Sequence, residues 1–127
     1  MISVVVADDQ TLVRAGFRVL IESADDLEVV GEAEDGRAVV DLVTQTSPDV
    51  VLMDVRMPVM DGIEATRRIK DRWPRMFVLG LTAFTDYPEI MLGAGADKCL
   101  LKTESYGSLT HVMERIRDES ETGTPWF

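Results

Sequence analysis

Five short apolar stretches recur along the chain and alternate with segments of mixed polarity. They are Ser3–Ala7, Leu27–Ala33, Asp49–Met53 with Asp54 behind it, Met76–Thr82 and Asp97–Leu101. The third stretch has no alternation of polar and apolar residues after Asp49, which indicates a strand covered on both faces. The second is more polar, so we expect it near a sheet edge. The pattern predicts five strands.

The segments between the strands carry apolar residues at helical spacing. In Thr11–Glu22 this spacing predicts an amphipathic helix with Arg14 and Arg18 on an exposed face. Its apolar positions are Leu12, Ala15, Gly16, Val19 and Leu20. Further helices are predicted around Val39, Leu42 and Val43, over Ile63–Arg72, from about Tyr87, and around Leu109, Val112, Met113 and Ile116. Alternating strands and helices predict an α/β fold: a doubly wound five-stranded parallel sheet, order 2-1-3-4-5, with helices on both faces.

Composition bounds the class of protein. The chain has 127 residues, enough for one domain with a sizeable core. Its net charge of −10 repels phosphate backbones, so we expect no direct nucleic-acid binding. No apolar run approaches the length that spans a bilayer, and the N-terminus does not resemble a signal peptide. A single cysteine, Cys99, fits a reducing, cytoplasmic environment.

Polar residues follow four of the predicted strands. Asp8 and Asp9 follow the first, Asp54 the third, Thr82 the fourth and Lys102 the fifth. The carboxyl ends of parallel strands meet at one edge of a sheet, so these side chains should converge on one cleft. Taken alone, Asp54 could equally start a turn or cap the next helix. The predicted convergence favours a functional role.

That cluster suits phosphoryl chemistry. Three neighbouring carboxylates repel one another, and a hard cation such as Mg²⁺ accepts oxygen ligands. The Lys102 ammonium and the Thr82 hydroxyl are suited to phosphate oxygens. A carboxylate in such a setting can attack phosphorus and form an acyl phosphate.

The chain resembles the response regulator receiver domain family (CheY-like). The resemblance covers residues 2 to 118 and rests on ADDQTLVRAGF, VGEAEDGRAVV, PDVVLMDVRMPVMDGIEATRRI and the LLK of the fifth strand. These motifs look like the subfamily with a LuxR-type helix-turn-helix output (NarL/FixJ-like). The resemblance implies a flavodoxin-like fold in residues 1–118, with 119–127 as linker or C-terminal tail.

The resemblance also implies a role for each polar residue. Asp54 would be the phosphoacceptor, with a sensor histidine kinase as the donor. Thr82 and Lys102 would contact the phosphoryl group. Mg²⁺ would be bound directly by Asp9 and Asp54, through water by Asp8, and by the backbone carbonyl of Arg56. Independently of the resemblance, Arg56 and Phe84 stand two residues after Asp54 and Thr82, and from these positions we expect them to line the mouth of the cleft. The domain would not be a classical enzyme, because it would only phosphorylate and slowly dephosphorylate itself.

Three positions depart from the family pattern. Cys99 stands where a Tyr or Phe is usual, the interval from Thr82 to Lys102 is short, and Thr103 follows the lysine. The shortage falls in the fourth helix, which Gly93 and Gly95 weaken further. We therefore expect an atypical coupling between phosphate and the face formed by the fourth helix and fifth strand.

The leading function is the regulatory module of a DNA-binding transcription factor. The alternative is a stand-alone adaptor that binds a protein target when phosphorylated. A hydrolase with an Asp nucleophile is disfavoured, because Arg56 occupies the position of its second acid. A flavin carrier is disfavoured because the cleft is acidic. A homodimer through the last helix, or through the fourth-helix and fifth-strand face, is a further expectation.

Overall fold

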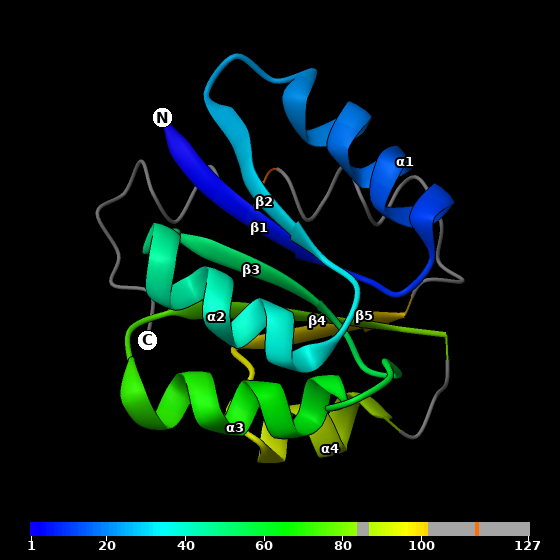
Figure 1. The fold of residues 1–127 in the computed structure, drawn as a ribbon, viewed down its shortest axis with the longest axis vertical. Coiled ribbons are helices and arrows are strands. Elements are labelled where there is room, and N and C mark those ends of the chain that lie inside the picture. The colour runs from blue at the N-terminus through cyan, green and yellow to red at the C-terminus, as the bar shows by residue number, and fades with distance from the viewer. Residues whose placement is uncertain (84–86, 102–113, 115–127) are drawn as a thin grey trace.

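The computed structural model describes residues 1–83, 87–101 and Glu114. Within them the chain forms a five-stranded parallel sheet with helices on both faces (Figure 1). Its elements are β1 (Ile2–Ala7), α1 (Thr11–Glu22), β2 (Leu27–Ala33), α2 (Gly36–Thr46), β3 (Val50–Asp54), α3 (Gly62–Arg72), β4 (Phe77–Thr82), α4 (Tyr87–Gly93) and β5 (Lys98–Leu101). Lys102, Phe84 and the predicted last helix lie outside the described residues, apart from Glu114.

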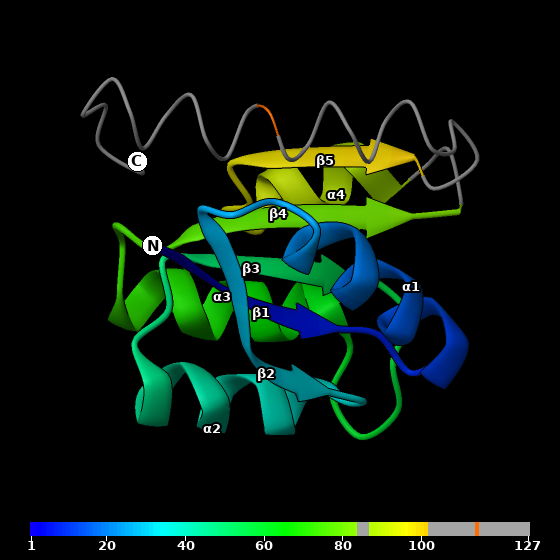
Figure 2. The same cartoon turned by 90° about the horizontal axis from the view of Figure 1, so that it is seen from above.

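The strands lie in the order β2-β1-β3-β4-β5 (Figure 2), which confirms the predicted topology. Every neighbouring pair is parallel. The strand β3 lies at the centre and is buried along its whole length. Its unbroken apolar run is therefore explained by helices on both sides, as predicted.

Alternate residues of each strand enter two separate cores. Val4, Val6 and Leu52 face α1 and pack with its residues Phe17 and Ile21. Their neighbours in the sequence face the other way, where α2, α3 and α4 cover the sheet; Val5, Val51, Met53, Val39, Ile69 and Met91 meet there. This two-residue period is the direct consequence of strand geometry.

The rotation of α1 differs from the predicted one. Leu12 and Val19 are 87% and 74% exposed, and the buried positions are Phe17 and Ile21, with Val13 partly buried beside them. The helix carries two apolar stripes, and the one that reaches the sheet contains the larger Phe17 side chain. Burial of the larger apolar area is favoured, so the stripe with Phe17 faces the sheet. The prediction from helical spacing, which placed Leu12 and Val19 on the apolar face, was therefore wrong.

Residues 84–86, directly before the fourth helix, lie outside the described residues, so the predicted shortness of this helix is not tested. The described part of the helix, Tyr87–Gly93, has 7 residues, against 11 in each of α2 and α3. It ends at Gly93, and Gly95 follows in a left-handed conformation with φ of 111°. Such a φ favours glycine, which explains why the chain turns here toward β5. The consequence for switching stays a prediction.

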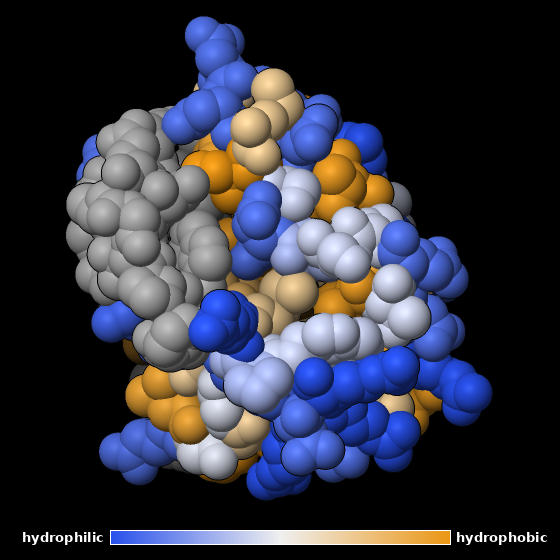
Figure 3. Space-filling view, turned by 90° about the vertical axis from the view of Figure 1, so that its left-hand side faces the viewer, coloured by the Kyte–Doolittle hydropathy of each residue, from blue (hydrophilic) through white to orange (hydrophobic). Residues whose placement is uncertain are grey.

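Remote from the carboxyl ends of the strands, the surface is mixed. Figure 3 views the left-hand side of Figure 1, where β1 begins, and shows hydrophobic residues scattered among hydrophilic ones. Within the part of the chain that the structure describes, no helix has the length and apolar character needed to cross a membrane.

An ion pair between Lys70 and Asp97 joins α3 to the residue directly before β5. The Lys70 ammonium lies 3.0 Å from a carboxylate oxygen of Asp97 and also donates to the Met76 carbonyl at 2.9 Å. Asp97 accepts a second hydrogen bond from the Val78 amide at 2.9 Å. Both charged side chains are largely buried, with 14% and 16% exposed. Asp97 therefore holds β4, β5 and α3 together.

Replacement of Asp97 by alanine should destabilise the fold by about 3 kcal/mol, because it leaves the largely buried Lys70 ammonium without its opposite charge and the Val78 amide without its acceptor. Urea unfolding would measure the loss. Arg68→Ala is the control, because it breaks a pair on the same helix whose side chains are 57% and 44% exposed. Exposed pairs contribute less than about 1 kcal/mol. Equal losses in the two variants would contradict the structural role of Asp97.

Candidate functional site

Three carboxylates meet at the carboxyl edge of the sheet. Asp8 and Asp9 follow β1, and Asp54 is the last residue of the neighbouring strand β3. One oxygen from each lies within 4.8 Å of the others. The predicted convergence of these acids is confirmed. Their roles stay predictions.

Burial differs among the three acids. Asp8 and Asp54 are 1% and 7% exposed, whereas Asp9 is exposed to solvent. Buried carboxylates this close are costly unless an opposite charge compensates them. Three carboxylates without a softer donor among them form a donor set that suits Mg²⁺. The residues present therefore fit the implied ion.

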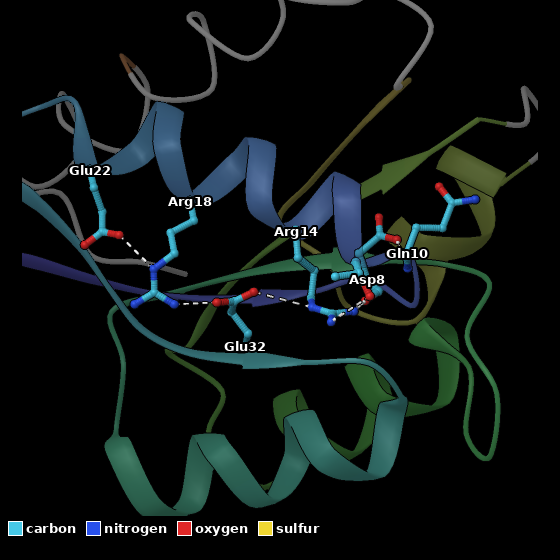
Figure 4. Close-up of polar contacts among 7 residues, drawn as sticks. Asp8, Gln10, Arg14, Arg18, Glu22 and Glu32 are labelled. Carbon is cyan, nitrogen blue, oxygen red and sulfur yellow. Dashed lines mark hydrogen bonds and ion pairs between the residues drawn. The ribbon is translucent and has the colours of Figure 1, made fainter.

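The backbone and side chain of Asp8 are held from several directions. Its amide donates to the Ala33 carbonyl of β2 at 3.0 Å. Its carboxylate accepts from the Gln10 amide at 2.9 Å, and its carbonyl accepts from the Arg14 guanidinium at 2.6 Å (Figure 4). Asx-type bonds of this kind are common where a chain turns out of a strand. Asp8 is thus held by β2, by α1 and by the loop residue Gln10, which directly precedes α1.

Asp54 is positioned by a close approach of α3. The Gly62 amide donates to the Val55 carbonyl at 2.7 Å, and Asp61 caps the helix by accepting from the Glu64 amide at 2.8 Å. A Cβ on Gly62 would lie 2.0 Å from the Asp54 carbonyl oxygen. Only glycine allows this approach, so Gly62 is required for the geometry around Asp54.

Thr82 is buried at the end of β4. Asp54 pairs with Leu81, and Thr82 is the next residue toward the same edge, with 1% of its surface exposed. Thr82 itself pairs with Leu101 of β5. Lys102 follows directly in the sequence but lies outside the described residues, so its predicted contribution is untested.

A depression of about 420 Å³ opens beside the acids. Its lining includes Asp9 and Arg56, which the sequence placed at the cleft, and also Tyr87 at the start of α4. The sequence indicated Tyr87 only as a helix start, because nothing local shows that α4 begins beside this loop. The remaining lining residues are Val55, Met57, Pro58, Asp61 and Ile63.

Arg14 was expected on an exposed helix face, and this expectation is wrong. Its side chain is only 13% exposed, and it reaches both Asp8 and Glu32 on β2. The sequence spacing of Arg14 and Glu32 gives no signal of this contact, because it depends on how α1 lies against β2.

The surroundings of Cys99 make its thiol poorly reactive. It is half-buried on β5 among residues of the second core. Burial raises the pKa of the Cys99 thiol to about 11, because the thiolate is poorly solvated there. The reactive thiolate is therefore scarce at neutral pH.

Comparison with known proteins agrees with this geometry. The family model for the response regulator receiver domain matches residues 4–114. The transcriptional regulatory protein LiaR of Bacillus subtilis is 44% identical over 115 residues, which is 89% of this chain and 54% of LiaR. The response regulator protein VraR of Staphylococcus aureus is 41% identical over 122 residues, 94% of this chain and 58% of VraR. The chain spans about half the length of these curated relatives.

Solved structures give the same result for the fold. The response regulator domain of Thermotoga maritima CheB matches with a TM-score of 0.85 and 30% identity, covering 93% of this chain and 95% of that chain. A LuxR-family two-component response regulator from Aurantimonas matches with a TM-score of 0.84 and 33% identity, covering 90% and 83%. With the topology and the acidic cluster, these similarities establish that the chain belongs to the response regulator receiver domain family of two-component systems.

Proposed function

We propose that Asp54 accepts a phosphoryl group from a phosphohistidine on a sensor histidine kinase. The observation that carries the proposal is the meeting of Asp8, Asp9 and Asp54 at one sheet edge, next to the buried Thr82. An Asp54 carboxylate oxygen attacks phosphorus, the bond from phosphorus to the donor nitrogen breaks, and the donor leaves with that electron pair. The product is an acyl phosphate, which water later cleaves.

The other residues assist this step by position and charge. The Thr82 hydroxyl donates a hydrogen bond to a phosphoryl oxygen, and the Lys102 ammonium neutralises another. Asp9, Asp54 and the Arg56 carbonyl would hold Mg²⁺ directly, with Asp8 acting through water. When bound, Mg²⁺ neutralises charge on the carboxylates and the phosphoryl oxygens. The donor set of the cluster supports this assignment.

We propose further that residues 1–118 form the regulatory module of a cytoplasmic transcription regulator, with 119–127 as linker or tail. The similarity to LiaR and VraR supports an output that binds DNA. The net charge of −10 argues against nucleic-acid binding by this domain itself. A stand-alone adaptor is the second candidate, and the reading frame beyond Phe127 separates the two. Homodimerisation through the last helix or the α4–β5 face stays a proposal.

The test is incubation of the chain with a small phosphodonor, with and without Mg²⁺, followed by intact mass measurement. We expect one phosphoryl adduct that forms with Mg²⁺, is suppressed by a chelator and is removed by hydroxylamine, which cleaves acyl phosphates. The metal requirement follows from the repulsion between the donor's negative charge and three clustered carboxylates. An adduct that forms equally well without the metal, or that survives hydroxylamine, would contradict the proposal.

A further inference from the structure

Arg14 connects α1, the β1–α1 loop and β2 through one side chain. One guanidinium nitrogen donates to the Asp8 carbonyl at 2.6 Å, and another lies 3.4 Å from the Thr11 hydroxyl. The Nε atom lies 3.4 Å from a carboxylate oxygen of Glu32. Figure 4 shows the side chain extending from α1 between Asp8 and Glu32. These contacts therefore connect the acidic cluster (Asp8, Asp9 and Asp54) to β2, the strand at the edge of the sheet.

The carbonyl that Arg14 binds belongs to the peptide between Asp8 and Asp9. Because a peptide unit is planar, the direction of this carbonyl also fixes the Asp9 amide and the path by which Asp9 leaves the sheet. The Asp8 amide is already bound to β2. Arg14 thus supplies the second backbone anchor of Asp8 and sets the relation between the two acids.

Arg18 provides an internal comparison, because it lies one turn further along α1. It pairs with the same Glu32 and with Glu22, at 2.8 Å from the latter, and these contacts do not involve the acidic cluster. Its side chain is 45% exposed, against 13% for Arg14. Two arginines of equal charge therefore share an acceptor, and only Arg14 contacts the backbone of Asp8.

We propose that Arg14 is a positioning residue for the metal site. It holds the peptide between Asp8 and Asp9 in the orientation that lets both acids face Asp54, while Glu32 orients Arg14 and compensates its charge. This inference rests on the proposed function, since it takes the three acids to bind Mg²⁺. Outer contacts that orient ligands commonly change metal affinity by tenfold or more.

Charge and positioning predict opposite effects for Arg14. A guanidinium near a cation site repels the cation, so its removal on charge grounds alone would strengthen Mg²⁺ binding. Loss of a positioning contact would weaken binding instead. The direction in which the Mg²⁺ affinity changes therefore distinguishes the two roles. A measurement of stability would not distinguish them.

The experiment compares Arg14→Gln with Arg18→Gln in the whole chain. Each variant removes one positive charge from α1 and one partner from Glu32. Calorimetric titration with Mg²⁺ should give a Kd raised about tenfold in Arg14→Gln and changed less than about twofold in Arg18→Gln. An unchanged or lower Kd in Arg14→Gln, or an equal rise in both variants, would overturn the proposal.

Amide hydrogen exchange without metal gives a second readout. We expect faster exchange at Asp9 and Gln10 in Arg14→Gln and unchanged exchange there in Arg18→Gln, whether or not metal binds. Unchanged exchange in Arg14→Gln would overturn the inference. Should the wild type bind no Mg²⁺, the proposed function fails and the exchange comparison still decides the role of Arg14. If Arg14→Gln does not fold, Arg14→Lys, which keeps the charge but lacks the guanidinium fork, serves in both measurements with the same expected directions.

Discussion

Replacement of Asp54 by asparagine is expected to abolish phosphoryl transfer to the chain. The amide of asparagine has nearly the shape of the carboxylate but lacks its nucleophilic oxygen, so the acyl phosphate cannot form. Intact mass after incubation with a phosphodonor and Mg²⁺ should show the adduct on the wild type alone. The variant should fold, since it removes one of three mutually repelling charges. Its stability in metal-free buffer should equal or exceed that of the wild type.

Asp61→Asn is the matched control for this prediction. Asp61 lines the depression beside the acids and caps α3 through the Glu64 amide. Asparagine caps helices about as well as aspartate, so this variant should fold and accept the phosphoryl group. An adduct on Asp54→Asn of the same size and lability as on the wild type would mean that another residue is the acceptor.

The second large effect is expected from Gly62→Ala. The added Cβ would lie 2.0 Å from the backbone carbonyl oxygen of Asp54 and 2.9 Å from its carbonyl carbon. The obstacle is backbone, so either α3 or the end of β3 must move. We expect a loss of stability of about 2 kcal/mol or more, even though alanine favours helix over glycine by about 1 kcal/mol. Phosphoryl transfer should fall as well, because the displaced residue is the proposed acceptor.

Gly16→Ala separates the steric effect from helix propensity. Gly16 lies within α1, and a Cβ there would meet no atom within 4 Å. This substitution should therefore stabilise the fold by about 1 kcal/mol. Urea unfolding of the two variants measures both effects. Equal behaviour of the two would contradict the steric role of Gly62.

The strands of the sheet could be predicted from the sequence, because the pattern of apolar and polar residues that marks each strand is local. The five strands, their parallel order and the burial of β3 follow from apolar runs, intervening helices and the handedness of crossovers. The boundaries differed by only one residue at several ends. The third strand begins at Val50, one residue later than predicted, and Asp49 precedes it with its carboxylate accepting hydrogen bonds from the amide and hydroxyl of Ser3 and its amide donating to the Ser3 carbonyl at 2.9 Å. The convergence of the acids was likewise implied, because parallel strands bring their carboxyl ends to one edge.

The sequence by itself thus determined the sheet, its order and the chemistry at its edge. Tertiary packing alone decided which stripe of α1 is buried, that Arg14 holds the backbone of Asp8, and that Gly62 permits α3 to approach Asp54. The physical reason is the range of the interactions. Hydrophobic periodicity is set by neighbours in the chain, whereas helix rotation and close backbone approach depend on which surfaces fit when distant segments pack together.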